Sequence, residues 1–305
     1  MEKVNVGVVG VGHLGTHHAK VYDHIKSTNL AGVCDVDKKQ ARKIGKKYKV
    51  WYYDDYRQLF DKIQAVSIAV PTSLHYKIAK DFLEAGIHVL VEKPISKTLE
   101  EADELIKIAE KNNLILQVGH IERFNPAVLA IEQYLESPRF IEGQRMGTFG
   151  KKSRIKDVGV VLDLMIHDID IVLGLLKSEV KNIEVVSTSS ISDYEDMANV
   201  RLVFKNGAIC DITASRVTDE EVRKIRIFQQ SSYLTLDLLH HDASIFRKKE
   251  GKIAKERIKI DRKEPLKSEL KSFINCVRTN SKPIVSGKEG REALAIALDI
   301  LDKIK

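Results

Sequence analysis

The strongest constraint on the fold of this sequence is a glycine pattern that directly follows its first apolar segment. The run Val4–Val9 is rich in β-branched residues, as is typical of a buried strand in a parallel sheet. It continues into Gly10-Val-Gly12-His13-Leu14-Gly15, which opens a helix expected over His13–Ile25. A strand, a G-x-G-x-x-G turn and a helix in this order are typical of a unit that binds a dinucleotide.

Each glycine of this turn has its own physical role. Gly10 permits the tight turn, Gly12 lets the backbone approach the pyrophosphate, and Gly15 lets the helix pack on the strand. The pyrophosphate is expected at the helix N-terminus, where N–H groups and the positive end of the helix dipole favour an anion. His13 and Leu14 complete the turn, so we count them among the cofactor-binding candidates.

An acidic residue follows at the distance that this pattern requires. Asp35 lies 20 residues after Gly15, at the end of the expected strand Leu30–Val36. Its carboxylate is expected to accept hydrogen bonds from the ribose hydroxyls of adenosine, which favours NAD over the 2′-phosphate of NADP. Lys38 and Lys39 follow closely and leave NADP as the second choice.

Strands and helices alternate through the first part of the chain. Beyond those already named, strands are expected at Ala65–Val70, His88–Val91 and Leu114–Val118, and helices at Lys38–Lys49, His75–Ala85 and Leu99–Asn112. Such alternation requires crossover connections and predicts a doubly wound parallel sheet. We therefore expect an α/β fold with an N-terminal Rossmann domain over residues 1–121.

The pattern then changes, because strands follow one another without helices between them. Helices are expected at Pro126–Leu135, Asp163–Leu176, Leu266–Thr279 and Lys288–Ile304, and strands at Ile183–Ser190, Asn199–Phe204, Ala208–Ala214, Lys224–Phe228, Tyr233–Leu238, Ser244–Lys248 and Glu256–Ile260. Residues 122–305 are therefore expected to form an α+β domain with an open, largely antiparallel sheet, for substrate binding and oligomerisation. Because exposed strands need to be covered, we expect a homodimer or homotetramer.

Composition and charge restrict the partners. A length of 305 residues suits two domains, and a net charge of +7 spread along the chain suits a small anionic substrate better than nucleic acid. Cys34, Cys210 and Cys276 lie far apart, so neither a disulfide nor a cysteine-rich metal site is expected. Neither a signal peptide nor an apolar run long enough to cross a membrane is evident, so we expect no membrane partner and a cytoplasmic location.

A second motif lies where a nicotinamide is expected. Glu92-Lys93-Pro94 follows a strand, and ligands of an open parallel sheet bind outside the carboxyl ends of its strands. The Lys93 ammonium could stabilise a developing alkoxide, or it could be an ordinary solvated lysine. Pro71, Thr72 and His75 follow the preceding strand, so we expect them, with Glu92 and Lys93, to border the cofactor.

The third candidate is the pair formed by Asp163 and His167. Residues four apart share one face of a helix, and histidine is suited to accept a hydroxyl proton while a neighbouring carboxylate orients it. The same spacing also fits a non-catalytic alternative, in which Asp163 is a carboxylate at the helix N-terminus and His167 is a packed histidine. Asp163 and His167 could supply only two metal ligands and no third is clear, so a metal site is the weaker interpretation here. The segment His240-His241-Asp242 is expected to be a loop. We therefore predict no bound metal.

Together these motifs resemble the Gfo/Idh/MocA family of oxidoreductases over essentially the whole chain. The resemblance rests on the glycine turn, on Glu92-Lys93-Pro94, and on the Asp163/His167 pair behind the loop Asp157-Val-Gly159. It implies a Rossmann domain followed by an α/β domain with an open sheet. It also implies catalysis by Lys93, Asp163 and His167, in which His167 takes the proton of a secondary alcohol on a sugar. The loop departs mildly from the family, which often has consecutive glycines there.

One further segment narrows the resemblance. Residues 119–126, Gly-His-Ile-Glu-Arg-Phe-Asn-Pro, resemble those of family members that oxidise C3 of UDP-N-acetylhexosamines, such as UDP-N-acetylglucosamine, to the 3-keto sugar. This resemblance marks Arg123 and Asn125, with His167, as candidates for substrate contact, although Arg123 could instead form a structural ion pair. Two alternatives stay open: a dehydrogenase of a free polyol or simple sugar, and a non-catalytic regulator that senses NAD.

Overall fold

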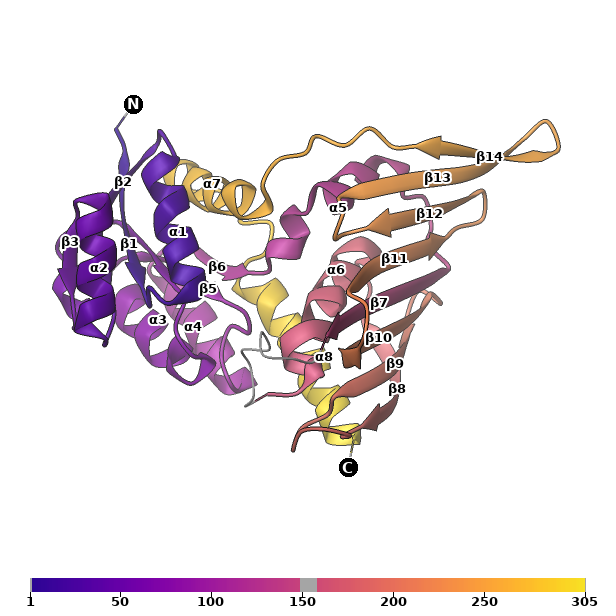
Figure 1. The fold of residues 1–305 in the computed structure, drawn as a ribbon, viewed down its shortest axis with the longest axis horizontal. Coiled ribbons are helices and arrows are strands. Elements are labelled where there is room, and N and C mark those ends of the chain that lie inside the picture. Colours follow the sequence, from indigo (N-terminus) through magenta and orange to yellow (C-terminus); the bar gives the residue numbers. More distant parts are fainter. Residues whose placement is uncertain (1, 149–157, 305) are drawn as a thin grey trace. The chain divides into compact units, whose positions relative to one another are not determined.

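A computed structural model of the chain describes residues 2–148 and 158–304 (Figure 1). Its contacts divide the chain into two compact units. The first comprises Met1–Ile121 with Pro265–Arg291, and the second comprises Glu122–Glu264 with Glu292–Lys305. Each unit has its own sheet and its own hydrophobic core.

The first unit is built on a parallel sheet. Its strands are β1 (Val4–Val9), β2 (Thr28–Cys34), β3 (Trp51–Tyr53), β4 (Ala65–Ile68), β5 (His88–Glu92) and β6 (Leu116–Gly119). They lie in the order β3-β2-β1-β4-β5-β6, and every neighbouring pair is parallel. This is the strand order of the dinucleotide-binding fold, so the predicted Rossmann architecture is confirmed.

Two of the crossover helices of this unit begin at recognisable capping residues. The helices are α1 (His13–His24), α2 (Lys38–Tyr48), α3 (His75–Glu84) and α4 (Leu99–Lys111). At the start of α2, Asp37 accepts hydrogen bonds from the N–H groups of Lys39 and Gln40. At the start of α4, Thr98 and Glu101 form a capping box.

A helix from near the end of the chain completes the first unit. This helix, α7 (Pro265–Thr279), was placed in the second domain by the sequence interpretation. Its Leu270 and Phe273 are fully buried in one apolar core with Tyr22 of α1. Because α7 supplies part of that core, residues 265–291 belong with the Rossmann sheet rather than with the second unit.

The second unit is built on an eight-stranded sheet. Its strands are β7 (Phe140–Thr148), β8 (Val180–Thr188), β9 (Met197–Phe204), β10 (Ile209–Thr218), β11 (Val222–Phe228), β12 (Ser232–Asp237), β13 (Asp242–Lys249) and β14 (Lys252–Arg257). They lie in the order β14-β13-β12-β11-β7-β10-β9-β8. The β7–β10 pair is parallel and the other pairs are antiparallel, which confirms the predicted α+β class.

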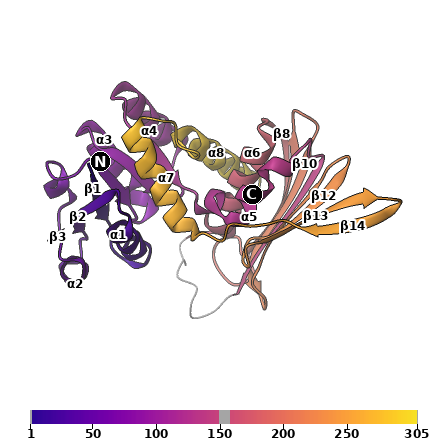
Figure 2. The ribbon, with the colours of Figure 1, turned by 90° about the horizontal axis from the view of Figure 1, so that it is seen from above.

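Helices cover one face of this sheet. Figure 2 shows α5 (Pro126–Ile131) and α6 (Ile166–Leu176) along that face. Residues from the later turns of α8 (Gly287–Lys303) share the apolar core with them and with the strands. The opposite face carries no helix of the described part of this unit. Within the described part of the chain, no helix combines the length and apolar character needed to cross a membrane.

Two local features of the second unit differ from expectation. The strand β7, which lies inside the sheet, was not predicted, because its buried positions include Gly143 and Arg145 rather than a run of apolar residues. The expected helix Asp163–Leu176 begins as a turn with π-helical hydrogen bonding over Val161–Met165 and becomes α6 only at Ile166.

Candidate active site

The glycine turn has a backbone that other residues would disturb. Gly10 has a φ of +81°, and a Cβ there would lie 2.5 Å from the carbonyl oxygen of Ala69. A Cβ at Gly15 would overlap the carbonyl oxygen of Gly10. At Gly12, by contrast, a Cβ would have no neighbour within 4 Å. The first and last glycines therefore serve the turn and its packing, while Gly12 leaves open space beside the backbone.

The surroundings of this turn fit a dinucleotide. The helix α1 begins after Gly12 without a side-chain cap and without an acidic residue in its first turn, so its N–H groups can receive a phosphate. Asp35 accepts hydrogen bonds from the N–H groups of Val11 at 2.8 Å and Asp37 at 2.9 Å. Its carboxylate is therefore fixed beside the turn, with lone pairs left for ribose hydroxyls. His13 and Leu14 are exposed at the same turn.

The Glu92-Lys93-Pro94 motif lies at the carboxyl end of β5, and its Lys93–Pro94 peptide is cis. Lys93 is half-buried there. The Glu92 carboxylate lies 3.0 Å from Nε2 of the buried His18 and packs against Gly119, where a Cβ would be 3.0 Å away. The sequence interpretation did not identify His18 as the partner of Glu92, because they are joined only by the packing of α1 on the sheet.

His75 has a different environment from the one expected. Its ring is 1% exposed, with Nδ1 lying 2.8 Å from the carbonyl oxygen of Pro94 and Nε2 lying 2.9 Å from that of Val70. Burial lowers the pKa of His75, and the two carbonyl contacts oppose that shift. His75 thus connects the two turns that carry Pro71 and Lys93. That His75 also borders the nicotinamide stays a prediction.

Asp163 and His167 are both half-buried within one helical segment of the second unit, while Met165 and Ile166 between them are fully buried. The start of this segment is held by Glu195, whose Oε1 accepts the N–H of Val161 at 3.0 Å. Sequence reasoning missed Glu195, because it comes from the end of a distant loop.

The glycine of the preceding loop has a definite role. A Cβ at Gly159 would overlap the Glu195 carboxylate, so glycine is needed for this cap. Asp157 of the same loop lies outside the described residues.

Arg123 and Asn125, two of the three residues expected to contact the substrate, differ in how accessible they are. Arg123 packs over α6, where its Nη1 lies 3.4 Å from Oδ1 of Asp170, and it lines a cavity of about 890 Å³ together with Arg139 and Lys177. Asn125 is 2% exposed; its Oδ1 caps α5 and its Nδ2 donates to Glu122 and to the carbonyl oxygen of Leu238. Asn125 is therefore placed to support the fold rather than to meet a ligand directly.

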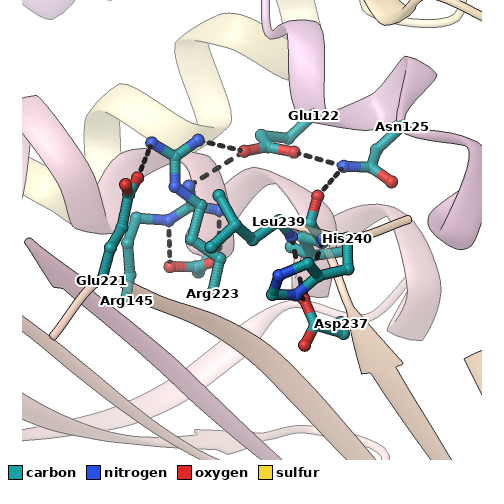
Figure 3. A network of polar contacts seen from close by, with 10 residues as sticks. Glu122, Asn125, Arg145, Glu221, Arg223, Asp237, Leu239 and His240 are labelled. Carbon is teal, nitrogen blue, oxygen red and sulfur yellow. Dashed lines mark hydrogen bonds and ion pairs between the residues drawn. The ribbon is translucent and has the colours of Figure 1, made fainter. Parts of the chain in front are cut away.

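A buried ion network surrounds Glu122 (Figure 3). The Arg145 guanidinium bonds Glu122 at 2.9 Å and both carboxylate oxygens of Asp168 at 2.8 and 2.9 Å. Burial alone would raise the pKa of Glu122, but Arg145 brings it below its ordinary value. Burial raises the pKa of Asp168, and Arg145 opposes the rise. A carboxylate near the start of a helix would be expected at a cap or in solvent, but Asp168 is buried against Arg145.

His240 and His241, which the sequence predicted to lie in a loop, are found in a turn. His240 is exposed between β12 and β13, with Nδ1 3.1 Å from Oδ1 of Asp237 (Figure 3). Across residues 2–148 and 158–304, no group of three His, Cys, Asp or Glu side chains could hold a metal ion.

Comparison with known proteins adds to this geometry. Residues 4–120 match the model of an oxidoreductase family with an NAD-binding Rossmann fold, and residues 128–234 match the GFO/IDH/MocA C-terminal domain. The chain is 34% identical to a UDP-N-acetylglucosamine 3-dehydrogenase of Acidithiobacillus ferrooxidans, over 98% of this chain and 97% of that protein. It is 28% identical to a scyllo-inositol 2-dehydrogenase (NAD(+)) of Bacillus subtilis, over 93% of this chain and 89% of that protein.

Solved structures of related proteins have the same fold as this chain. A structure of the Acidithiobacillus ferrooxidans enzyme matches with a TM-score of 0.94 and covers 100% of this chain and 98% of its own. A levoglucosan dehydrogenase solved with NADH and L-sorbose, 18% identical, shares the fold with a TM-score of 0.91 and covers 100% of this chain and 97% of its own. The chain therefore belongs to the Gfo/Idh/MocA family of NAD-binding oxidoreductases, as an enzyme of the dehydrogenase type.

Proposed function

We propose that this protein uses NAD to oxidise C3 of a UDP-N-acetylhexosamine, UDP-N-acetylglucosamine in the first place, to the 3-keto sugar. The observation that carries this proposal is the 34% identity over nearly the full length of a protein named for that reaction. The TM-score of 0.94 with the structure of that protein supports it, because the whole fold is shared.

The first unit would hold the cofactor. The glycine turn at the start of α1 would receive the pyrophosphate, and Asp35 would receive the adenosine ribose. Pro71, Thr72, Glu92 and Lys93, at the carboxyl ends of the next strands, would border the nicotinamide. When bound, NAD supplies a hydride acceptor at C4 of its nicotinamide.

Three side chains would act on the sugar hydroxyl. His167 would accept its proton, and Asp163, four residues earlier on the same segment, would orient that imidazole. Lys93 would hold positive charge near the oxygen as the alkoxide develops. Arg123 would face the diphosphate, in a cavity whose lining also contains Arg139 and Lys177 beside Glu132 and Glu136.

The open face of the second sheet would pair with a second copy of the chain. It carries a row of aromatic rings, in which Phe140 and Phe228 are 5.7 Å apart, and Phe228 and Tyr233 are 4.6 Å apart. Such apolar surface is stabilised when another copy covers it. We also keep a cytoplasmic location as a proposal, which three buried and unpaired cysteines fit.

A substrate panel tests the proposal. NADH formation would be measured with UDP-N-acetylglucosamine, N-acetylglucosamine, glucose and myo-inositol at equal concentration. We expect the nucleotide sugar to give the highest kcat/KM. Free N-acetylglucosamine should lose kcat as well as affinity, because contacts to the remote diphosphate help to position the reacting sugar.

The second candidate function is the oxidation of a free polyol, which the match to a scyllo-inositol dehydrogenase at 28% identity favours. The same panel separates the two candidates. If myo-inositol reacts best and UDP-N-acetylglucosamine is inert, the first proposal is wrong and the second replaces it.

A further inference from the structure

The proposed chemistry makes no use of a cluster of charged side chains inside the second unit (Figure 3). We call it the Arg145 cluster, and it consists of Glu122, Arg145, Asp168 and Arg223. Arg145 is 3% exposed, and its Nε, Nη1 and Nη2 each donate to a carboxylate oxygen. Arg223, which is opposite Arg145 on the neighbouring strand, lies 3.5 Å from Glu122 at the more exposed end.

The cluster joins segments that are far apart in the sequence. Glu122 lies in the short 3₁₀ turn Ile121–Phe124, Asp168 lies in the first turn of α6, and Arg145 lies in β7. One guanidinium therefore fixes the 3₁₀ turn and α6 to the same point of the sheet. Asn125 adds to the connection, because its Nδ2 donates to Glu122 at 2.9 Å.

The members of the cluster are sequence neighbours of the proposed site residues. Arg123 directly follows Glu122, and His167 directly precedes Asp168. A shift of the Asp168 backbone would therefore move His167 with it. Arg123 also reaches α6, where its Nη1 lies 3.4 Å from Oδ1 of Asp170. The placement of both site residues thus depends on how α6 and the 3₁₀ turn are held.

Stability alone does not account for these charges. Burying ions removes them from water, and well-packed apolar side chains of similar volume are often at least as stabilising. A bidentate arginine–carboxylate pair provides direction instead, because two parallel hydrogen bonds fix both distance and orientation. Apolar contacts would leave α6 freer to slide along the sheet.

We propose that Arg145 is a positioning residue: through Asp168 and Glu122 it holds the His167 imidazole and the Arg123 guanidinium in one fixed frame. The proposal rests on the proposed function, in which His167 accepts the sugar proton. Arg145 itself touches neither substrate nor cofactor in this role.

The first test is Arg145→Lys, which keeps the positive charge and removes the planar guanidinium that makes the bidentate hydrogen bonds. With UDP-N-acetylglucosamine, or the best substrate of the panel, we expect kcat to fall at least tenfold and the isotope effect of the C-deuterated substrate to rise. The NADH dissociation constant should stay within twofold, because the first unit holds the dinucleotide. Arg201→Lys is the matched control: it alters an exposed pair with Asp211 on the same sheet and should leave kcat within twofold.

A second variant covers the case in which a lone lysine is not tolerated. The combination Glu122→Gln, Arg145→Met and Asp168→Asn removes the three buried charges together, and the more exposed Arg223 keeps Glu221 as its partner. Folding would be judged by circular dichroism and by NADH binding. The same loss of kcat and rise in isotope effect are expected.

The outcomes separate this proposal from the proposed function. Wild-type kcat and isotope effect in either folded variant would overturn the positioning role, even if the melting temperature fell. Failure of both variants to fold would also count against it, since the cluster would then be purely structural. Wild-type turnover in His167→Ala would instead overturn the proposed role of His167.

Discussion

At the scale of single residues, Asp35 has a structural role beside the ribose-binding role proposed for it. It accepts two backbone N–H groups and so fixes the glycine turn to the end of β2. Lys38, the nearest lysine that could favour a 2′-phosphate, forms an exposed ion pair with Asp54 at 2.5 Å. Both observations agree with a preference for NAD over NADP.

We expect the wild-type protein to bind NAD more tightly than NADP. Asp35→Ser combined with Lys38→Arg should shift the ratio of the two dissociation constants at least tenfold toward NADP, about 1.4 kcal/mol, because an anion is removed and a phosphate-binding fork is added. Calorimetric titration of both cofactors measures this, with Asp61→Ser as the exposed acidic control. Tenfold tighter binding of NADP by the wild type would contradict the assignment.

His167→Ala and Lys93→Ala should each lower kcat by about 100-fold or more, because proton acceptance and alkoxide stabilisation are lost. The NADH dissociation constant should change little. Steady-state kinetics and fluorescence titration check both statements. The exposed residues His24 and Lys97 provide matched controls as His24→Ala and Lys97→Ala, with near wild-type kcat expected. A role is wrong if its variant turns over normally while hydride transfer limits the rate.

At the scale of elements, the connection between β8 and β9 is organised by one carboxylate. Asp196 is fully buried, and its Oδ2 accepts the N–H groups of Ser190, Ile191 and Ser192 at 2.6 to 3.0 Å. Burial alone would raise the pKa of Asp196, but these N–H groups and the Ser192 hydroxyl lower it overall. The neighbouring Glu195 caps the segment that carries Asp163, so this loop also bears on the proposed site.

Asp196→Asn should lower the free energy of unfolding by about 1–3 kcal/mol at pH 7, because an anion that three donors satisfy is replaced by a neutral amide. The pKa of Asp196 is lower in the folded than in the unfolded protein. The stabilisation is therefore present above about pH 4 and is lost as the pH falls through the folded value. Urea unfolding at several pH values measures the difference, which should shrink in acid. The exposed Asp193, as Asp193→Asn, should show no such loss.

At the scale of the whole molecule, the aromatic row on the second sheet predicts self-association. Phe140, Phe228, Tyr233 and Phe246 are in register across β7, β11, β12 and β13, on the face opposite the helices. Phe228→Asp should convert a dimer or tetramer at micromolar concentration into smaller species, because a charge would be buried at the interface. Analytical ultracentrifugation decides this, with Arg201→Lys as control. A monomeric wild-type protein would refute the prediction.

Much of this protein follows from the sequence by itself, because the relevant signals are local. The glycine turn, the alternation of strands and helices in the first unit, and Asp35 lie within about one βαβ unit, and the structure confirms the Rossmann strand order. The sequence also predicted where Lys93 and His167 lie in their elements. Lys93 follows a predicted strand, and His167 has helical spacing from Asp163. Their roles remain predictions.

Other features were decided only by the tertiary structure. The helix α7 joins the Rossmann unit because Leu270 and Phe273 complete a core around Tyr22, a contact between residues far apart in the chain. The strand β7 carries the buried Arg145, which from the sequence alone would be predicted to lie at the surface. Only the folded chain brings its partners Glu122 and Asp168 to it. Local propensity and hydrophobic period act over a few residues. The energy of burying a charge, in contrast, depends on partners that only the folded chain supplies.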